Sequence, residues 1–463
     1  MLAVLLGQLI TPLDVGLNNT SLPTIGQSLN LGVAASGWIM GVFWLFATVF
    51  MIIAGRTGDV LGRRKIFSYG IFVFIVGSLA SGFSPNYPVL LAARAVQGLG
   101  AALTSSNALA LICCSFSEEQ RGKALGLLAA CISLGFTIGP LLGGFICSSL
   151  GWRYIFFVNI PLGLVALILC LRFVEESETE PDQSIDLLGA LILLTILAPA
   201  SLSLIQVSSW GWLSPYTISL FLLALVAGWV FVMHERAAAQ PVIDLGLLRI
   251  PAFSLSNMAT YALFISSRLA LFIAPFYLQY YRDMPVYLIG LVISLTNVIP
   301  LVLLIPSGII SDRVGTTGLE LFGMSSIALS LGLPLVAGSQ LTMPLLIISL
   351  LLIGLGYGVF YSPNLRAVMG SVPQSGLGFA GGVTATMRNF GFLTSIGLAS
   401  SVLGVWAVQR PDSPGTAFSD PGFQTAVKHA YFAAFLVALA GLAFLLLRGY
   451  LSARSAKKID ILY

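Results

Sequence analysis

Residues 55–65 read GRTGDVLGRRK, and residues 308–315 read GIISDRVG. Both stretches contain a glycine, three residues, an aspartate, two residues and a second glycine, and the second copy follows the first by 253 residues. The tripeptide GLG at 98–100 returns at 354–356, at an offset of 256. Similarity at one fixed period indicates a structural repeat. The pattern therefore predicts two halves of six helices each, related as parallel repeats.

The composition excludes a soluble globular protein. Of the 463 residues, 57% are hydrophobic and 9% are charged, whereas soluble domains carry about 25% charged residues. Because a helix needs roughly 20 apolar residues to cross a bilayer, this content supplies on the order of a dozen spans. The expected fold class is an all-α integral membrane protein.

Apolar runs bounded by charged or turn-forming residues predict fourteen membrane-spanning helices. Six helices occupy about 172 residues in the first half, so an offset near 255 leaves about 80 residues for two additional helices between the halves. The predicted arrangement is two six-helix bundles plus two extra helices. The expected spans are 2–24, 35–55, 66–84, 88–112, 123–148, 153–172, 187–206, 216–234, 252–280, 286–310, 318–337, 342–365, 378–407 and 426–448.

Basic residues predict the orientation of these helices. With a cytoplasmic N-terminus, fifteen of the 22 Lys and Arg residues fall on the cytoplasmic side, which is the side that they favour. Both termini are therefore predicted to be cytoplasmic. The expected division is an N-terminal bundle at 1–172, an acidic cytoplasmic loop with two additional helices at 173–250, and a C-terminal bundle with a short basic tail at 251–463.

Several other kinds of site are not expected. The five cysteines have no CxxC spacing, which argues against a disulfide framework or a zinc site, and the two histidines stand apart. The net charge of +4 does not suggest a nucleic-acid partner. The sequence has no glycine-rich phosphate loop of the kind found in ATP-driven pumps. No metal, cofactor or enzymatic activity is therefore expected.

The first copy of the repeated motif is a candidate gating loop on the cytoplasmic side. Gly55 and Gly62 permit a tight turn, and Asp59 is placed to cap the following helix or to pair with a cation of the neighbouring bundle. Arg63 and Arg64 make the loop basic. Such a loop can hold the cytoplasmic face closed and release it as the halves rock. The alternative is a turn that acts as a positively charged topology anchor.

The fifth predicted helix carries regularly spaced small residues. Gly126 is followed by Gly135, Gly139, Pro140 and Gly143. Glycines four residues apart form a smooth face on which another helix can pack closely, and Pro140 removes a backbone donor and favours a kink. The second repeat keeps the first two of these glycines but not the later positions.

Asp14 is the one carboxylate predicted to lie deep in the membrane. It lies about 20 Å from the cytoplasmic end of the first helix, and Arg94 lies about 9 Å from the outer edge in the fourth. In a core roughly 30 Å thick these depths nearly coincide. An adjacent arginine favours the ionised carboxylate whereas desolvation disfavours it, so a small rearrangement can change its proton affinity. The pair is a candidate for proton coupling, or alternatively a permanent bridge between two helices.

Three further polar residues are predicted inside helices. Gln97 follows Arg94 by about one helical turn, and Arg268 and Arg388 are placed in the ninth and thirteenth helices. A charge in hydrocarbon is expensive unless it is paired or faces a cavity. Each of these two arginines is therefore expected either to neutralise a substrate anion or to bond to backbone carbonyls across the bundle.

These features resemble the major facilitator superfamily, and specifically its fourteen-helix drug:proton antiporter branch. Residues 55–65 resemble the superfamily motif between helices two and three, Arg94–Gly100 resembles its helix-four motif, and Gly126–Gly143 looks like the antiporter motif. More stretches look like this branch: Leu13, Asp14, Asn19, Leu22 and Pro23 in helix one, WRYIFFVNIPLG at 152–163, and Tyr277-Leu278-Gln279.

The sequence also departs from the pattern of the branch. Gly16 stands where the branch usually has threonine, which affects the polar contacts expected around Asp14. The second loop motif lacks the basic run of the first, which suggests a weaker latch in the second half.

The resemblance implies that inward proton flow drives export of small, largely apolar or cationic compounds by alternating access, as in multidrug efflux. Asp14 would alternate between protonated and substrate-linked states, Arg94 would tune it, and the region from Gly139 to Gly144 would seal one bundle against the other. The candidate substrate cavity would comprise Asn19, Gln97, Arg268, Gln279 and Arg388.

The resemblance also implies a multi-pass protein of the plasma (inner) membrane, with a small-molecule substrate, protons and the lipid bilayer as partners. An accessory envelope protein is left open as a further partner. Two other functions also stay open. One is export of a specific endogenous metabolite such as a siderophore, lipid or antibiotic, and the other is that of a non-transporting membrane receptor.

Overall fold

The computed structural model describes residues 1–115, 118–176, 187–237, 246–337, 342–372, 377–408 and 421–460. Every regular element within these ranges is a helix, as the sequence predicts. In chain order these are α1 (Leu2–Ser28), α2 (Val33–Val49), α3 (Met51–Leu61), α4 (Arg63–Gly82), α5 (Tyr87–Ser115), α6 (Glu118–Ser149), α7 (Tyr154–Phe157), α8 (Asn159–Phe173), α9 (Leu187–Trp210), α10 (Pro215–Ala237), η1 (Leu247–Arg249), α11 (Pro251–Phe276), η2 (Tyr277–Tyr281), α12 (Val286–Val314), α13 (Thr317–Ala337), α14 (Met343–Gly370), α15 (Leu377–Val408) and α16 (Pro421–Asp460).

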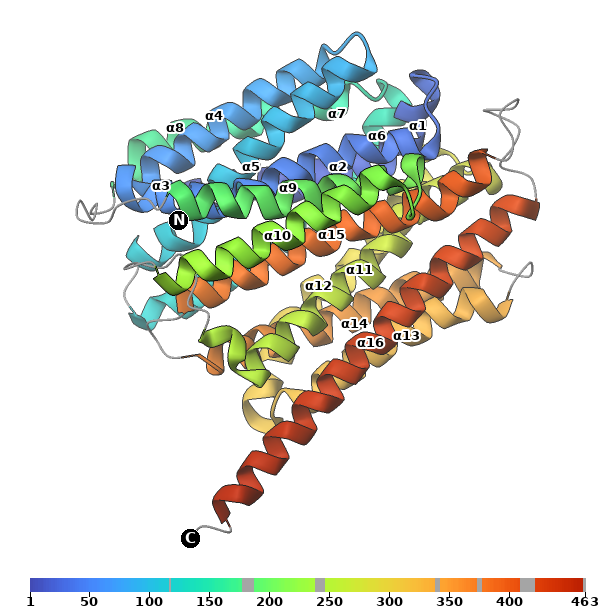
Figure 1. Ribbon diagram of the computed structural model, residues 1–463. Helices are drawn as coiled ribbons and strands as arrows, with labels where there is room; N and C mark the ends of the chain where they lie inside the picture. The colour runs from blue at the N-terminus through green and yellow to red at the C-terminus, as the bar shows by residue number, and fades with distance from the viewer. Residues whose placement is uncertain are drawn as a thin grey trace.

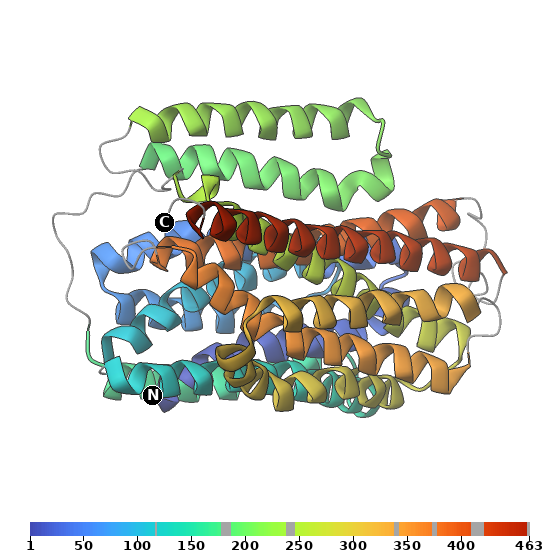
Figure 2. The same cartoon turned by 90° about the horizontal axis from the view of Figure 1, so that it is seen from below.

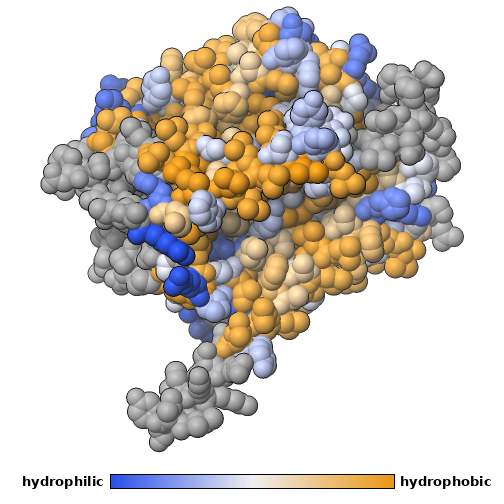
Figure 3. Space-filling view, in the orientation of Figure 1, coloured by the Kyte–Doolittle hydropathy of each residue, from blue (hydrophilic) through white to orange (hydrophobic). Residues whose placement is uncertain are grey.

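Many of these helices are apolar enough to cross a bilayer. Within the described ranges, nine have the length and composition of a membrane span, and two shorter apolar helices, Ala35–Val49 and Leu191–Leu204, accompany them. Hydrophobic side chains cover most of the middle of one face (Figure 3). The count of fourteen spans stays a prediction. The chain starts and α16 ends at the same end of the bundle (Figures 1 and 2), and the cytoplasmic location of that end also stays a prediction.

The repeated glycine motif is helical over most of its length, which corrects the predicted loop. α3 ends at Leu61, and the chain turns only at Gly62, whose φ is 102°. The turn in the second copy likewise falls on its last glycine, Gly315, with a φ of 84°. Glycine adopts positive φ without steric cost. Asp59 lies inside α3 and therefore does not cap α4, whose N-cap is Gly62. Its side chain lies outside the described residues.

The helix pairings recur in the two halves of the chain. α1 packs on α6 as α11 packs on α15, and α4 packs on α5 as α13 packs on α14. α2 contacts α5, and α12 contacts α14 in the same way. These are the pairings that two copies of one six-helix unit produce. The division at 1–172, 173–250 and 251–463 stays a prediction.

The largest contacts between the two bundles are made by two helix pairs, α6 with α12 and α2 with α15. The first pair is in close backbone contact, because a Cβ built on Gly144 would lie 2.6 Å from a carbonyl oxygen of α12 and 3.2 Å from the Cα of Gly290. A Cβ built on Gly290 would overlap the carbonyl oxygen of Pro140. In the second pair the rings of Trp44 and Phe392 stack with their centroids 4.1 Å apart. Both boundaries are therefore closely packed.

α9 and α10 form a hairpin on the outside of the two bundles (Figure 2). α9 contacts both α2 and α15, so it lies over one of the two boundaries between the halves. A Cβ built on Gly397 of α15 would overlap the carbonyl oxygen of Leu204. The indole Nε1 of Trp38 in α2 donates a hydrogen bond of 3.3 Å to Gln206 Oε1. The hairpin is thus attached to both halves.

A buried ion pair holds the C-terminal half together at a place where the sequence predicts none. Glu320, in the first turn of α13, pairs with Arg448 of α16, and both side chains are buried. Arg448 Nη1 also donates a hydrogen bond of 2.7 Å to Ser256 Oγ of α11. The last helix does not end at Arg448 as predicted, because α16 continues to Asp460, and the basic tail stays a prediction. Asp14 is also not the only buried carboxylate, because Glu320 is fully buried.

Replacing Glu320 by alanine is expected to lower the free energy of unfolding by about 3–5 kcal/mol, because Arg448 would stay buried without its carboxylate. The exposed pair of Arg366 and Asp312 provides the control, since their side chains are 48% and 62% exposed. Asp312→Ala should cost less than about 1 kcal/mol. Unfolding of the purified protein in detergent measures both losses, and equal values for the two variants would contradict this expectation.

Candidate functional site

The regularly spaced glycines of α6 bring it into backbone contact with α1. Cβ atoms built on Gly139 and Gly143 would lie 2.7 Å from the carbonyl oxygen of Leu13 and 2.8 Å from the Cα of Leu17. Gly16 belongs to the same contact, because a Cβ there would lie 2.6 Å from the ring of Pro140 and 2.9 Å from the Cα of Gly139. A threonine would not fit at position 16. The departure from the branch pattern therefore has a packing reason.

This contact involves residues of α1 before and after Asp14, among them Leu13 and Gly16. Gly135 also takes part, since a Cβ there would lie 2.8 Å from the ring of Pro12. The surroundings of Gly126 lie outside the described residues. The stripe thus packs inside its own half, whereas Pro140 and Gly144 contact α12 of the other half.

Asp14 and Arg94 form an ion pair inside the N-terminal half. Arg94 Nη1 of α5 lies 2.6 Å from Asp14 Oδ2 of α1, and neither side chain is exposed. Two further contacts hold Arg94. Its Nε donates a 3.1 Å hydrogen bond to the carbonyl oxygen of Ile39, and its guanidinium carbon lies 4.5 Å from the ring centroid of Phe43. α1, α2 and α5 therefore meet at this pair.

Two amides complete the polar cluster around Asp14. Asn159 Nδ2, from the start of α8, donates a 2.7 Å hydrogen bond to Asp14 Oδ1. Gln97 Nε2 donates a weaker one of 3.4 Å to the same atom, and Gln97 Oε1 accepts a 2.7 Å hydrogen bond from Arg94 Nη1. Ser78 of α4 accepts from Gln97 Nε2 at 2.7 Å. Asn159 and Ser78 were not predicted as site residues.

The cluster keeps some of its hydrogen-bonding capacity unused. Arg94 Nη2 and Asn159 Oδ1 are buried and have no hydrogen-bond partner among the described residues. An unpaired buried polar atom costs free energy comparable to a lost hydrogen bond. Because these two atoms have no partner in the present arrangement, a rearrangement of the network can give them hydrogen bonds that they lack here.

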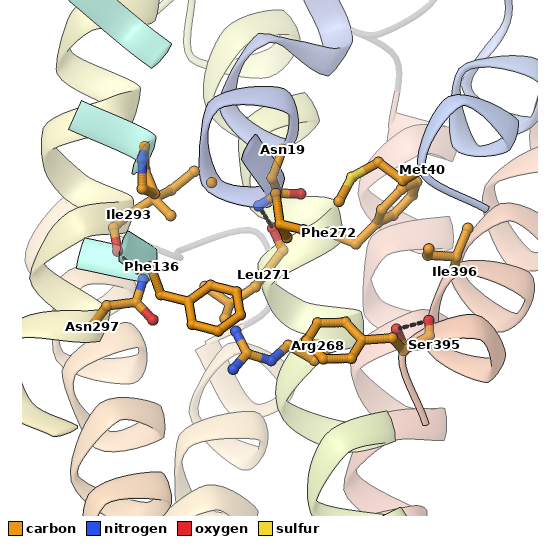
Figure 4. A pocket seen from close by; sticks show the side chains of 14 residues that line it. Asn19, Met40, Phe136, Arg268, Leu271, Phe272, Ile293, Asn297, Ser395 and Ile396 are labelled. Carbon is orange, nitrogen blue, oxygen red and sulfur yellow. Dashed lines mark hydrogen bonds between the residues drawn. The ribbon is translucent and has the colours of Figure 1, made fainter. Parts of the chain in front are cut away.

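A cavity lies between the two halves, next to this cluster. Its empty space amounts to about 460 Å³, which includes a part that is open to the surroundings. Its lining comes from α1, α2 and α6 of one half and from α11, α12 and α15 of the other (Figure 4). The lining residues are Val15, Gly16, Asn19, Met40, Phe136, Pro140, Arg268, Leu271, Phe272, Ile293, Asn297, Phe392, Ser395 and Ile396.

Arg268 is the charged residue of this lining. Its guanidinium carbon lies 4.9 Å from the ring centroid of Phe392 and 5.2 Å from that of Phe136, beside which it is seen in Figure 4. Its Nε is buried without a hydrogen-bond partner. A second, smaller cavity of about 220 Å³ shares Arg268, Leu271 and Asn297 with the first.

The other predicted cavity residues lie at several places. Asn19 lines the cavity and donates a 3.2 Å hydrogen bond to the carbonyl oxygen of Leu271. Gln97 belongs to the Asp14 cluster instead. Gln279 donates to Thr24 Oγ1 at 3.2 Å, and Arg388 Nε donates to Asn389 Oδ1 at 3.3 Å. Neither Gln279 nor Arg388 lines the cavities described above.

The predicted gating residues lie in α3 and at the turn between α3 and α4. Arg63 begins α4, and the backbone N–H of Arg64 donates to Glu176 Oε1 at 3.0 Å. The side chain of Arg64 donates from Nη1 to the carbonyl oxygen of Val174, also at 3.0 Å. The segment that follows α8 is therefore fastened to this turn within the N-terminal half. Gly55, inside α3, has an open environment, with Ser106 at 3.7 Å from a built Cβ.

Relatives of the chain are transporters. Multidrug resistance protein Stp of Mycobacterium tuberculosis is 32% identical over 412 residues, which cover 88% of this chain and 76% of the relative. The riboflavin transporter RibZ of Clostridioides difficile is 28% identical over 403 residues, 87% of each chain. The tetracenomycin C resistance and export protein of Streptomyces glaucescens is 28% identical over 412 residues, 89% of this chain and 76% of the relative.

Solved structures share the fold. A peptide transporter POT in complex with sulfate superposes with a TM-score of 0.70 at 15% identity, over 97% of this chain and 95% of that chain. The xylose transporter XylE from E. coli gives 0.61 at 16% identity, over 96% and 97%. A family model described as the Major Facilitator Superfamily matches residues 4–396. This chain, a multi-pass membrane protein and not an enzyme, belongs to the Major Facilitator Superfamily.

Proposed function

We propose that this chain exports small, largely apolar compounds across the plasma membrane by alternating access, in exchange for protons. The names of its relatives support export, because they include multidrug resistance proteins and a protein that exports an antibiotic. The proposal takes both termini as cytoplasmic and the segment 173–250 as an insertion between two six-helix bundles. The partners are the substrate, protons and the bilayer.

One observation carries the proposal: Asp14 is fully buried in an ion pair, and the next residues of α1 line the cavity. Val15 and Gly16 face the space between the halves, one and two residues beyond Asp14. Protonation of Asp14 would remove the charge that holds Arg94, and α1 would carry the resulting shift to the cavity wall. In this proposal Asp14 carries the proton, and Arg94 opposes its protonation electrostatically.

The packing residues have a second role in the proposal. Gly135, Gly139 and Gly143 hold α1 close to α6, so a movement of α1 also moves α6. Pro140 and Gly144 connect α6 to α12 of the other half. The cytoplasmic turn, with Gly55, Asp59, Gly62, Arg63 and Arg64, acts as the gate that opens and closes with this motion.

Reconstituted protein tests the function directly. Purified protein is reconstituted in proteoliposomes with an acidic lumen, and a panel of anionic, neutral and cationic aromatic compounds is added outside. The lumenal pH and the concentration of each compound in the lumen are measured. We expect some members to accumulate and to raise the lumenal pH, and a protonophore to abolish both effects. A panel without pH-gradient-driven accumulation would refute proton-coupled export. Flux that only equilibrates a compound would indicate a channel.

A further inference from the structure

We propose that the cavity selects compounds carrying a negative charge on an aromatic framework, and that Arg268 makes this selection. The inference rests on the proposed export function and names its substrate class. It departs from the expectation of apolar or cationic compounds that the sequence resemblance implies, because it assigns the substrate a negative charge.

Four aromatic rings surround the guanidinium of Arg268. Beside Phe136 and Phe392, the rings of Phe264 and Tyr357 lie 5.7 Å and 5.5 Å from its guanidinium carbon. Arginine stacks on aromatic faces and keeps its charge in a buried environment. The Tyr357 side chain also makes a hydrogen bond with Arg268.

No carboxylate of the described residues neutralises the charge of Arg268. Two other arginines buried in the bundles each have a carboxylate, since Arg94 pairs with Asp14 and Arg448 pairs with Glu320. Within the described ranges, Arg268 has no carboxylate within ion-pair distance, and its Nε has no hydrogen-bond partner. A buried charge without a counter-ion is costly unless something else supplies one. A bound anion would supply it.

The remaining lining favours an aromatic anion over a cation. The described residues around the cavity include no carboxylate, and the polar ones, such as Asn19, Asn297 and Ser395, are neutral. Phe136, Phe272 and Phe392 provide ring faces for a planar compound. A cation in the same space would be repelled by the charge of Arg268, and charges inside a protein interact more strongly than charges in water.

Arg268 and Asp14 then have separate tasks. Asp14 faces its own half and is paired there, whereas Arg268 lines the space between the halves. Export of a monoanion in exchange for one inward-moving proton transfers two positive charges inward. The membrane potential, negative inside, therefore assists export together with the pH gradient. A monocation exchanged for one proton would transfer no net charge.

A matched pair of probes tests the charge preference. Naphthalene-2-sulfonate and (2-naphthyl)trimethylammonium share one ring system, carry opposite fixed charges and do not titrate. We expect wild-type proteoliposomes with an acidic lumen to accumulate the sulfonate at least roughly tenfold more than the ammonium compound, because a charge-assisted pair with arginine is among the strong hydrogen bonds. In Arg268→Gln this ratio should fall to about one.

Two variants and a binding measurement complete the experiment. Arg268→Lys keeps the charge without the planar stacked group, so an intermediate ratio is expected. Arg236→Gln removes an exposed arginine of α10 and should leave the ratio unchanged. Equilibrium dialysis of both probes against each detergent-purified variant measures binding independently of the proton gradient. It should show the same order of preference.

Each outcome decides between the inference and the function on which it rests. Gradient-driven accumulation with an equal or greater preference for the ammonium compound would overturn the inference and leave proton-coupled export standing. The same holds for an unchanged ratio in Arg268→Gln. Selective sulfonate binding without gradient-driven accumulation would support the anion site and refute the export function. Binding of neither probe would also overturn the inference.

Discussion

Asp14→Asn is expected to reduce pH-gradient-driven accumulation to the level of protein-free vesicles. Asparagine has nearly the shape of aspartate and can still accept the hydrogen bond from Asn159, which is 2.7 Å long in the wild type. It cannot bind or release a proton in the working pH range, and it leaves Arg94 without a counter-ion. The side chains are fully buried, so the substitution should also lower stability by about 3–5 kcal/mol. Initial rates of uptake with an imposed pH gradient measure the first effect.

The Glu320→Gln variant separates coupling from stability. Glu320 is a fully buried carboxylate paired with an arginine, as Asp14 is, but it lies away from the cavity lining. We expect Glu320→Gln to lose stability and to keep gradient-driven uptake. In Asp14→Asn, exchange of labelled for unlabelled substrate should persist, because exchange requires no net proton transfer. Full gradient-driven uptake by Asp14→Asn would exclude Asp14 as the proton carrier.

Gly139→Val is expected to prevent the native packing of α1 on α6. The built Cβ already lies 2.7 Å from the Leu13 carbonyl oxygen and 2.9 Å from the Cα of Gly16, and two methyl groups add to it. The neighbours are backbone atoms, which cannot move aside as a flexible side chain can. We therefore expect a loss of about 3 kcal/mol or more in the free energy of unfolding. Transport should fall with it, because the wall of the cavity would be displaced.

Gly228→Val is the control for this substitution. Gly228 lies in α10, and a Cβ built there has no atom within 4 Å. Valine should therefore be accommodated with little change, apart from its weaker helix propensity. Thermal unfolding in detergent and the yield of monodisperse protein measure the difference between the two variants. Similar stability for Gly139→Val and Gly228→Val would show that close α1–α6 contact is not required.

The sequence predicts the helical repeat well because hydrophobic runs in a membrane are long and unambiguous. The depths of Asp14 and Arg94 could be compared by counting residues along two helices, and the structure places these side chains in contact. Asn159 was missed as a partner of Asp14, since it is neutral and lies near the start of a different helix. It lies within the run WRYIFFVNIPLG, but nothing in its spacing indicates which side chain it contacts.

Helix ends were harder to predict than helix centres. Gly55 and Gly58 look like turn residues, yet α3 continues through both, and the turn needs only the positive φ of Gly62. Charged residues likewise suggested that the last helix ends near Arg448. That side chain instead finds Glu320 inside the bundle, and a pairing between distant helices leaves no signal in either local sequence.

The cavity depends on how helices from the two halves face each other, which the sequence does not specify. The sequence identifies Arg268 as a charge within a helix, but three of its four ring neighbours come from other helices, α6, α14 and α15. Gln279 matched a motif and lies instead in a polar contact with Thr24, between η2 and α1. A motif fixes a position along the chain and leaves the rotation of the helix undetermined.

The α9–α10 hairpin makes the access of compounds from the lipid phase unequal on the two flanks of the molecule. α9 covers the boundary between α2 and α15, so acyl chains meet the outer face of the hairpin there. On the α6–α12 flank, exposed side chains such as Phe145, Leu141 and Leu291 face the surroundings directly. A compound dissolved in the bilayer can therefore approach the junction of the two halves sideways along α6 and α12, and the hairpin shields the opposite route.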